Sequence, residues 1–257
     1  MTEAVAGNAA PDSPGWRYYL QRPVVIIFFL GFSGGLPFPL VYSTLTGWLE
    51  DANIERSTIS TFAWLGFAYS FKFLWSPLVD NVEVPLLSRW LGHRRAWLLT
   101  SQLALGACLF SLSVIDPSLE MTAFAIIAIC VAFLSATQDI VIDAFRIESA
   151  EQELQSVLAA AYQYGYRLAV VVAMAGALYI AQFASWTAAY KVMAACMAVG
   201  VITTLLCSEP KVRSGLVIKL TGSVVEQAAQ WKCLAVVEPC APGLKRYRGW
   251  SLLMLAF

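Results

Sequence analysis

The sequence is poor in charge and in the residues that metal sites and most enzymes require. Only 13% of its 257 residues are charged, against about 25% in a typical soluble domain, and the formal net charge is zero. His93 is the only histidine, and none of the six cysteines forms a CxxC or Cys/His pattern. We therefore expect no metal site, no cofactor and no nucleic-acid partner. The absence of a nucleophile–base pair argues against an enzyme.

What the sequence does contain is an excess of apolar residues, 59% against about 45–50% in soluble proteins. Six apolar runs reach the length of about 20 residues that a helix needs to cross a bilayer. They are residues 24–44, 58–79, 96–115, 121–143, 156–181 and 186–207. The pattern predicts an all-α integral membrane protein with a six-helix bundle over residues 22–207.

Polar or mixed segments flank this predicted bundle. Residues 1–21 are predicted to form a disordered cytoplasmic tail, and residues 208–249 a cytoplasmic linker. A new apolar run follows over residues 250–257, which we interpret as the start of a seventh span in an incomplete chain. Lys and Arg gather between the second and third runs and after the sixth, which predicts a cytoplasmic N-terminus.

Charged residues within membrane spans are rare and usually mark function. In "FLSATQDIVIDAFRIE", residues 133–148, a rotation of about 100° per residue places Ser135, Asp139, Asp143 and Arg146 on one stripe of a helix. An ordinary ion pair at the helix end explains Asp143 and Arg146 equally well. The depth of Asp139 in its run favours a role in a cavity.

Two cations lie in similar surroundings within the second and fifth runs. Lys72 follows Tyr69 in "FAYSFKF", and Arg167 follows Tyr164 in "YQYGYRL". Inverted three-helix repeats, which are common in secondary transporters, would make these two runs correspond. The alternatives are that Lys72 extends to the lipid headgroups and that Arg167 is a buried structural partner of an Asp.

Two further segments have patterns with more than one reading. The run "GFSGGLPFPL" allows close helix packing or a broken helix beside a cavity. In the loop after the second run, Asp80 precedes the pair Arg94 and Arg95, which suggests either a charge latch or a solvated loop.

These segments carry a resemblance. The loop from Asp80 to Arg95 is similar to a diverged loop motif of the major facilitator superfamily. The strings "GFSGGLP", "FKFLWSPLVD", "RRAWLL", "LSATQDIVIDAFRIE" and "YGYRLA" resemble the AmpG family of muropeptide permeases. The resemblance implies the six-helix N-terminal half of a major facilitator fold, whose missing C-terminal half completes the binding site.

The resemblance also implies a function. Members of that family import anhydro-muropeptides from periplasm to cytoplasm with protons, across the bacterial inner membrane, so the implied partners are the bilayer, this solute and protons. It suggests substrate contacts by Lys72, Arg167, Tyr69, Tyr162 and Tyr166. It suggests proton coupling by Asp139 and Asp143, and a cytoplasmic gate formed by Asp80, Arg94, Arg95 and Arg146. The alternatives are a fragment that does not transport and a carrier of another anionic metabolite such as acetyl-coenzyme A.

Overall fold

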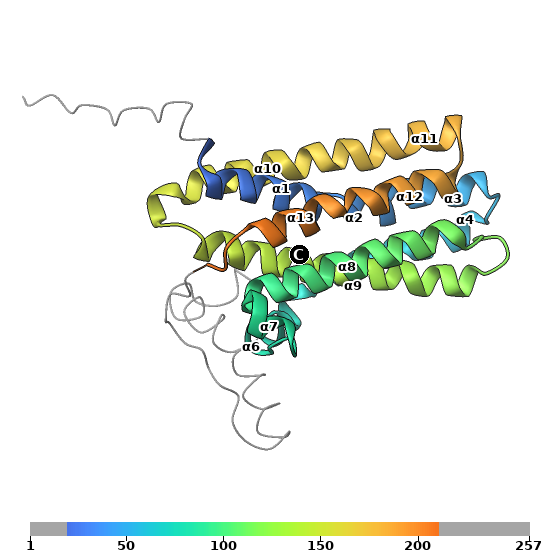
Figure 1. Cartoon of the computed structure of the whole chain (residues 1–257). Coiled ribbons are helices and arrows are strands. Elements are labelled where there is room, and N and C mark those ends of the chain that lie inside the picture. The colour runs from blue at the N-terminus through green and yellow to red at the C-terminus, as the bar shows by residue number, and fades with distance from the viewer. Residues whose placement is uncertain (1–19, 211–257) are drawn as a thin grey trace, which may run out of the picture.

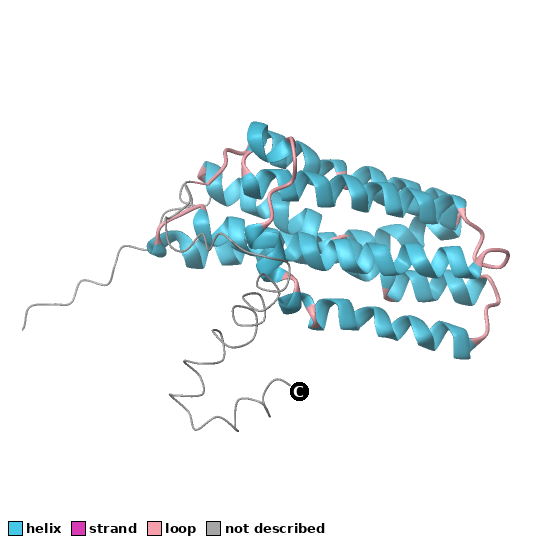
Figure 2. Ribbon diagram, turned by 90° about the horizontal axis from the view of Figure 1, so that it is seen from below, coloured by secondary structure: helices cyan, strands magenta, loops and turns pink. Residues whose placement is uncertain are grey.

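The computed structural model describes residues 20–210 as a bundle of helices that run side by side along one long axis (Figures 1 and 2). No strand occurs among these residues, in agreement with the predicted all-α class. Of the predicted tail, linker and seventh span, only residues 20–21 and 208–210 are described. We call the end of the bundle at which the chain enters at Arg22 the proximal end, and the opposite end the distal end.

Five helical stretches within residues 20–210 are long and apolar enough to cross a bilayer, so the chain is a multi-pass membrane protein. The first joins α1 (Arg22–Gly35), α2 (Pro37–Val41) and α3 (Ser43–Asp51). The next two are α8 (His93–Val114) and α9 (Met121–Glu148). The fourth joins η4 (Gln152–Leu154), α10 (Gln155–Val171), a π-helical turn η5 (Val172–Gly176) and α11 (Ala177–Phe183). The last joins α12 (Trp186–Cys196) and α13 (Ala198–Leu206).

The second predicted span differs from expectation, because its residues form short pieces rather than one long helix. These are α4 (Arg56–Thr61), η2 (Phe62–Leu65), α5 (Gly66–Ser70), η3 (Lys72–Leu74) and α6 (Ser76–Asn81), followed by α7 (Leu87–Leu91). One cause is visible: the Tyr42 hydroxyl donates to the Ala63 carbonyl (3.2 Å) and lies where a side chain at Gly66 would stand. A side chain inserted into the helical ladder is a recognised cause of irregular turns.

Small residues let the first and fifth predicted spans approach closely. A methyl group at Gly31 would collide with the Tyr162 carbonyl, one at Gly35 with the Tyr166 carbonyl, and one at Gly165 with the Phe28 carbonyl. Lipid tails are as apolar as the side chains of a helix, so the hydrophobic effect does not drive helices together within a bilayer. Close van der Waals packing of this kind drives their association instead. The close packing expected for "GFSGGLPFPL" is confirmed. The helix is also interrupted shortly after this segment, at Tyr42, where the backbone leaves the helical region (φ −104°, ψ −89°), whereas Leu36 keeps helical angles.

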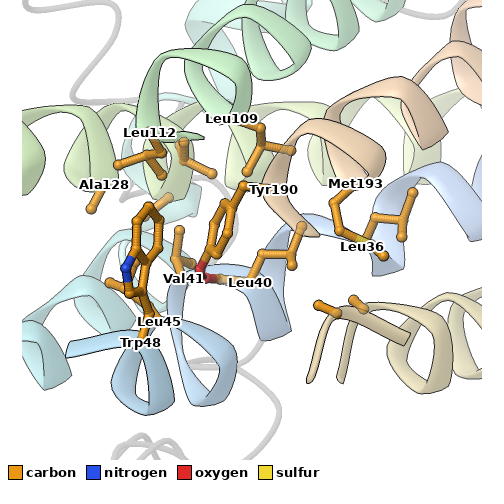
Figure 3. Packing of buried hydrophobic residues seen from close by; sticks show 14 of the residues in the cluster. Leu36, Leu40, Val41, Leu45, Trp48, Leu109, Leu112, Ala128, Tyr190 and Met193 are labelled. Carbon is orange, nitrogen blue, oxygen red and sulfur yellow. Dashed lines mark hydrogen bonds between the residues drawn. The ribbon is translucent and has the colours of Figure 1, made fainter. Parts of the chain in front are cut away.

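The apolar core of the distal half is built around aromatic side chains. Trp48 of α3 packs against Tyr190 of α12, with ring centroids 4.8 Å apart (Figure 3). It also packs against Phe124 of α9, at 5.2 Å. The buried Tyr190 hydroxyl donates to the Leu40 carbonyl (2.6 Å), next to the break in the first span. This bond supplies a partner to a backbone group of the broken helix.

Two buried hydrogen bonds each join a pair of spans. Gln138 Nε2 of α9 donates to Ser33 Oγ of α1 (2.9 Å), and Thr204 Oγ1 of α13 donates to Gln102 Oε1 of α8 (2.9 Å). All four side chains are buried. Polar contacts of this kind hold helices together in lipid and fix how the side chains of α9 are turned.

Candidate functional site

Asp139 is the carboxylate that the fold buries most clearly. Its residue is 8% exposed on α9, and its Oδ1 atom has no hydrogen-bond partner. The same atom lies 3.2 Å from the point at which a methyl group on Gly34 of α1 would stand, so α1 passes directly beside it. A buried polar atom without a partner is costly in a membrane interior, so Asp139 is a candidate functional residue.

Further polar atoms around Asp139 are also buried and without a partner. They are the Tyr69 hydroxyl, Ser135 Oγ and Gln138 Oε1. The hydroxyls of Tyr69 and Ser135 lie near each other. Buried polar atoms normally have partners. A group of polar atoms without hydrogen-bond partners around one carboxylate is therefore suited to bind a solute, a proton or water.

The structure brings Lys72 to this group and does so from the interrupted second segment. Lys72 is half-buried and is the cation that acts on Asp139, while Asp143 lies one turn further along α9. Lys72 and Asp139 are not within ion-pair distance among the described residues. The ammonium group of Lys72 therefore lies within electrostatic range of Asp139 but does not form an ion pair with it.

Two tyrosines of α10 complete the group, which we call the central polar cluster: Lys72, Tyr69, Ser135, Gln138, Asp139, Tyr162 and Tyr166. The rings of Tyr162 and Tyr166 have centroids 6.0 Å apart, and both residues interact electrostatically with Asp139. The Tyr162 hydroxyl also lies 3.7 Å from the methyl position of Gly34. The predicted residues Lys72, Tyr69, Tyr162, Tyr166 and Asp139 therefore do gather in space.

Arg167 does not join the central polar cluster. It is exposed and lines a separate pocket of about 330 Å³ between the first and fifth predicted spans. The remaining lining residues are Phe38, Pro39, Ser43, Gln163, Tyr166, Val170 and Met174. Only Tyr166 belongs to both places. The similar sequence surroundings of Lys72 and Arg167 thus do not give the two cations equivalent positions.

The predicted gate residues lie at the proximal end, where Arg94 is the centre of an ion-pair group. Arg94 donates to Asp80 at the end of α6 (2.6 Å) and to Glu148 at the end of α9 (2.7 Å). Arg95 instead donates to the carbonyls of Thr204 and Leu205 at the end of α13, at 3.0 Å each. The gate residues therefore tie together the ends of four helical segments.

Arg146 and Asp143 make only a long contact of 3.5 Å. The side chain of Asp143 is 43% exposed and that of Arg146 is 21% exposed. Such a pair contributes little to stability. Arg146 thus lies apart from the Arg94 group, although both were predicted to serve one gate.

Sequence reasoning missed Glu209 and Glu148. Glu209 Oε1 and Oε2 accept from the backbone N–H groups of Arg94 (2.7 Å) and Arg95 (3.1 Å), which caps the first turn of α8. Gly92 precedes that turn with φ +91°, and a methyl group there would collide with Glu209. The available signal was a 22-residue helix that begins without a capping side chain of its own. The identity of a partner 115 residues away could not be read from spacing.

Comparison with known proteins gives consistent similarities. A protein-family model described as "Acetyl-coenzyme A transporter 1" matches residues 23–191. The chain is 39% identical over 185 residues to "Putative transporter AmpG 4" of Rickettsia conorii, which covers 71% of this chain and 44% of that protein. It is 35% identical over 240 residues to the "Anhydromuropeptide permease" of Escherichia coli K12, which covers 93% of this chain and 46% of the permease. The chain spans about half the length of the curated relatives it matches.

Proposed function

The chain belongs to the acetyl-coenzyme A transporter 1 family, and from this premise we propose that it forms half of a proton-coupled importer of anhydro-muropeptides. The E. coli relative supports the solute class, because its name describes a permease for anhydro-muropeptides, and the Rickettsia relative is named as a putative transporter. We place the protein in the bacterial inner membrane, with the proximal end and the N-terminus in the cytoplasm.

The observation that carries this proposal is that the central polar cluster, inside a membrane bundle, contains buried polar atoms without hydrogen-bond partners. Asp139 is buried, its Oδ1 atom is unpaired, and Lys72 is the cation nearby. A site that binds and releases a solute and a proton needs groups whose partners are not already supplied by the protein. The remaining half of the carrier would contribute the facing wall, since substrates of such carriers lie between two repeats.

The roles follow from charge. When Asp139 is ionised, it attracts Lys72 and competes with an anionic solute for the ammonium group. Protonation of Asp139 removes that competition, so Lys72 becomes free to bind a lactyl or peptide carboxylate of the solute. Tyr69, Tyr162 and Tyr166 would then pack against sugar rings or order the cation. Asp143 is the next acid toward the proximal end and would pass the proton on.

The ion-pair group at the proximal end would act as the cytoplasmic latch. Arg94 holds the ends of α6 and α9, and Arg95 holds the end of α13. In an alternating-access carrier, these contacts must be made in one state and weakened in another. Arg167 would bind a second anionic group of the solute in its own pocket.

A chimera tests the proposal. Residues 1–210 of this chain are fused to the second half of the E. coli permease and expressed in E. coli that lacks its own permease. We expect uptake of labelled GlcNAc–anhydro-MurNAc peptide that collapses when a protonophore is added. A chimera that inserts into the membrane but shows no uptake would contradict the proposal. Uptake by the chimera but not by the 257-residue chain would indicate that this chain does not transport the solute by itself.

A second candidate solute is acetyl-coenzyme A, which the description of the matching family model favours. It shares anionic groups with a muropeptide but adds an adenine ring and phosphates, which would bind Lys72 and Arg167. Competition separates the two solutes: excess acetyl-coenzyme A should leave muropeptide uptake by the chimera unchanged. Strong inhibition, together with uptake of labelled acetyl-coenzyme A, would make acetyl-coenzyme A the favoured solute.

A further inference from the structure

The fifth predicted span contains a π-helical turn, η5, at Val172–Gly176, and this turn has a side-chain partner in another span. Thr44 of α3 donates from Oγ1 to the Ala173 carbonyl at 3.1 Å, and the bond is buried. Isolated π turns are rare and occur often at functional sites. Ser and Thr side chains commonly supply partners to backbone groups in such irregular membrane helices.

The turn affects which residues of the span pack inward. The buried small residues recur at every fourth position: Ala161, Gly165, Ala169, Ala173 and Ala177. In a regular α-helix, four residues turn by about 400°, so this stripe would drift by about 40° at each step. Because a π turn holds more residues than an α turn, it offsets the drift and keeps Ala173 and Ala177 on the packed side.

The same turn shapes the Arg167 pocket. Gln163, Arg167 and Val170 line it from α10, before the π turn, and Met174 lines it from within the turn. If η5 became a regular α-turn, the two parts of the span would rotate against each other by roughly 100°, the angle of one helical residue. Arg167 and Met174 would then no longer face the same space.

We propose that Thr44 is a positioning residue: its hydrogen bond to Ala173 holds the π turn and so sets the wall of the Arg167 pocket. Thr44 does not line the pocket, whereas its neighbour Ser43 does. It therefore acts through the backbone of the facing span. The consequence for solute binding rests on the proposed function, but the consequence for the pocket wall does not.

The first experiment measures the pocket wall directly. In the full chain with its native cysteines replaced by alanine, Met174→Cys is labelled in membrane vesicles with a small charged thiol reagent. We expect labelling of Met174→Cys and none of the buried Ala177→Cys. Adding Thr44→Val should slow the labelling of Met174→Cys at least about fivefold, and Thr44→Ser should restore it because it keeps the hydroxyl.

Thr46→Val is the matched control. Thr46 lies on the same helix and donates to the carbonyl of its own Tyr42 (2.8 Å), so its loss leaves η5 untouched. Unchanged labelling in Thr44→Val, or an equal loss in Thr46→Val, would overturn the proposal. A parent chain in which Met174→Cys is not labelled would also overturn it, because the pocket would not reach Met174.

The second experiment uses uptake by the chimera. Thr44→Val should raise KM about tenfold with Vmax changed less than twofold, and Thr44→Ser should return KM to the parent value. A general loss of packing would instead lower Vmax through the amount of inserted protein. If the parent chimera takes up no muropeptide, the proposed function fails, while the labelling experiment still decides the role of Thr44. If the parent transports and KM is unchanged in Thr44→Val, the proposal fails alone.

Discussion

The central polar cluster and the proximal ion-pair group contain similar side chains but differ in how far their bonds are satisfied. Arg94 donates to two carboxylates, and Glu209 caps the backbone beside it. Asp139, Gln138 and Tyr69 each keep a buried polar atom without a partner. A group whose hydrogen bonds are all made within the protein stabilises one arrangement of helices. A group with unpaired polar atoms can instead form new hydrogen bonds with a ligand. Under the proposed function, the degree to which hydrogen bonds are satisfied therefore distinguishes the latch from the binding site better than charge does.

The largest effect should come from Asp139→Asn. We expect this change to abolish muropeptide uptake by the chimera, because in the proposed function Asp139 carries the coupling proton. The melting temperature of the protein in detergent should stay the same or rise, since an unpaired buried carboxylate is removed. Asp116→Asn in the distal loop is the control and should leave uptake unchanged. Normal uptake in Asp139→Asn would remove this carboxylate from the mechanism.

Arg94→Ala tests the opposite side of the comparison. The change leaves Asp80 and Glu148 facing each other without their shared cation, so we expect a loss of about 2 kcal/mol in the free energy of unfolding. Partial exposure of Asp80 keeps the loss below that of a fully buried pair. Denaturant unfolding in detergent measures it, with the exposed Arg89→Ala as the control. Equal stability of the two variants would show that the latch contributes nothing.

Lys72→Met should separate solute binding from stability. The ammonium group is half-buried and has no ion-pair partner within bonding distance among the described residues, so its loss should change the melting temperature little. We expect KM for muropeptide to rise about tenfold, as one charge-assisted contact is lost. Lys191→Met, on the surface of α12, is the matched control. A KM equal to that of the parent would place the solute elsewhere.

The smallest expected effect is that of Glu209→Ala, which removes the cap of α8. Loss of a helix cap typically costs about 1 kcal/mol, and uptake should fall only through a less stable proximal end. Glu209→Asp shortens the side chain, keeps the charge and should recover part of the loss. Denaturant unfolding of the three proteins decides this. A decrease as large as that of Arg94→Ala would mean that the two groups form one network.

The sequence could predict the stripe on α9 because helical geometry alone relates Ser135, Asp139 and Asp143. It could predict the Arg94–Asp80 contact through a loop motif of short range. The interrupted second segment was not predictable, since Tyr42 acts on Ala63 from another span. The position of Arg167 was missed for a similar reason: local resemblance to Lys72 says nothing about which neighbouring helix each residue meets. Hydrophobic runs predict the lengths of membrane spans, while tertiary contacts decide where the helix of a span is interrupted.

The interruption of the first span at Tyr42 and the π turn η5 of the fifth predicted span have a joint structural consequence. Toward the proximal end, the glycines of α1 and α10 bring the two backbones into contact. The irregular turns follow in both spans, packed against each other at α2 and η5 and joined by the Thr44–Ala173 bond. A change in the backbone at either irregular turn would therefore be felt by both spans, because the two turns are in contact and share a hydrogen bond.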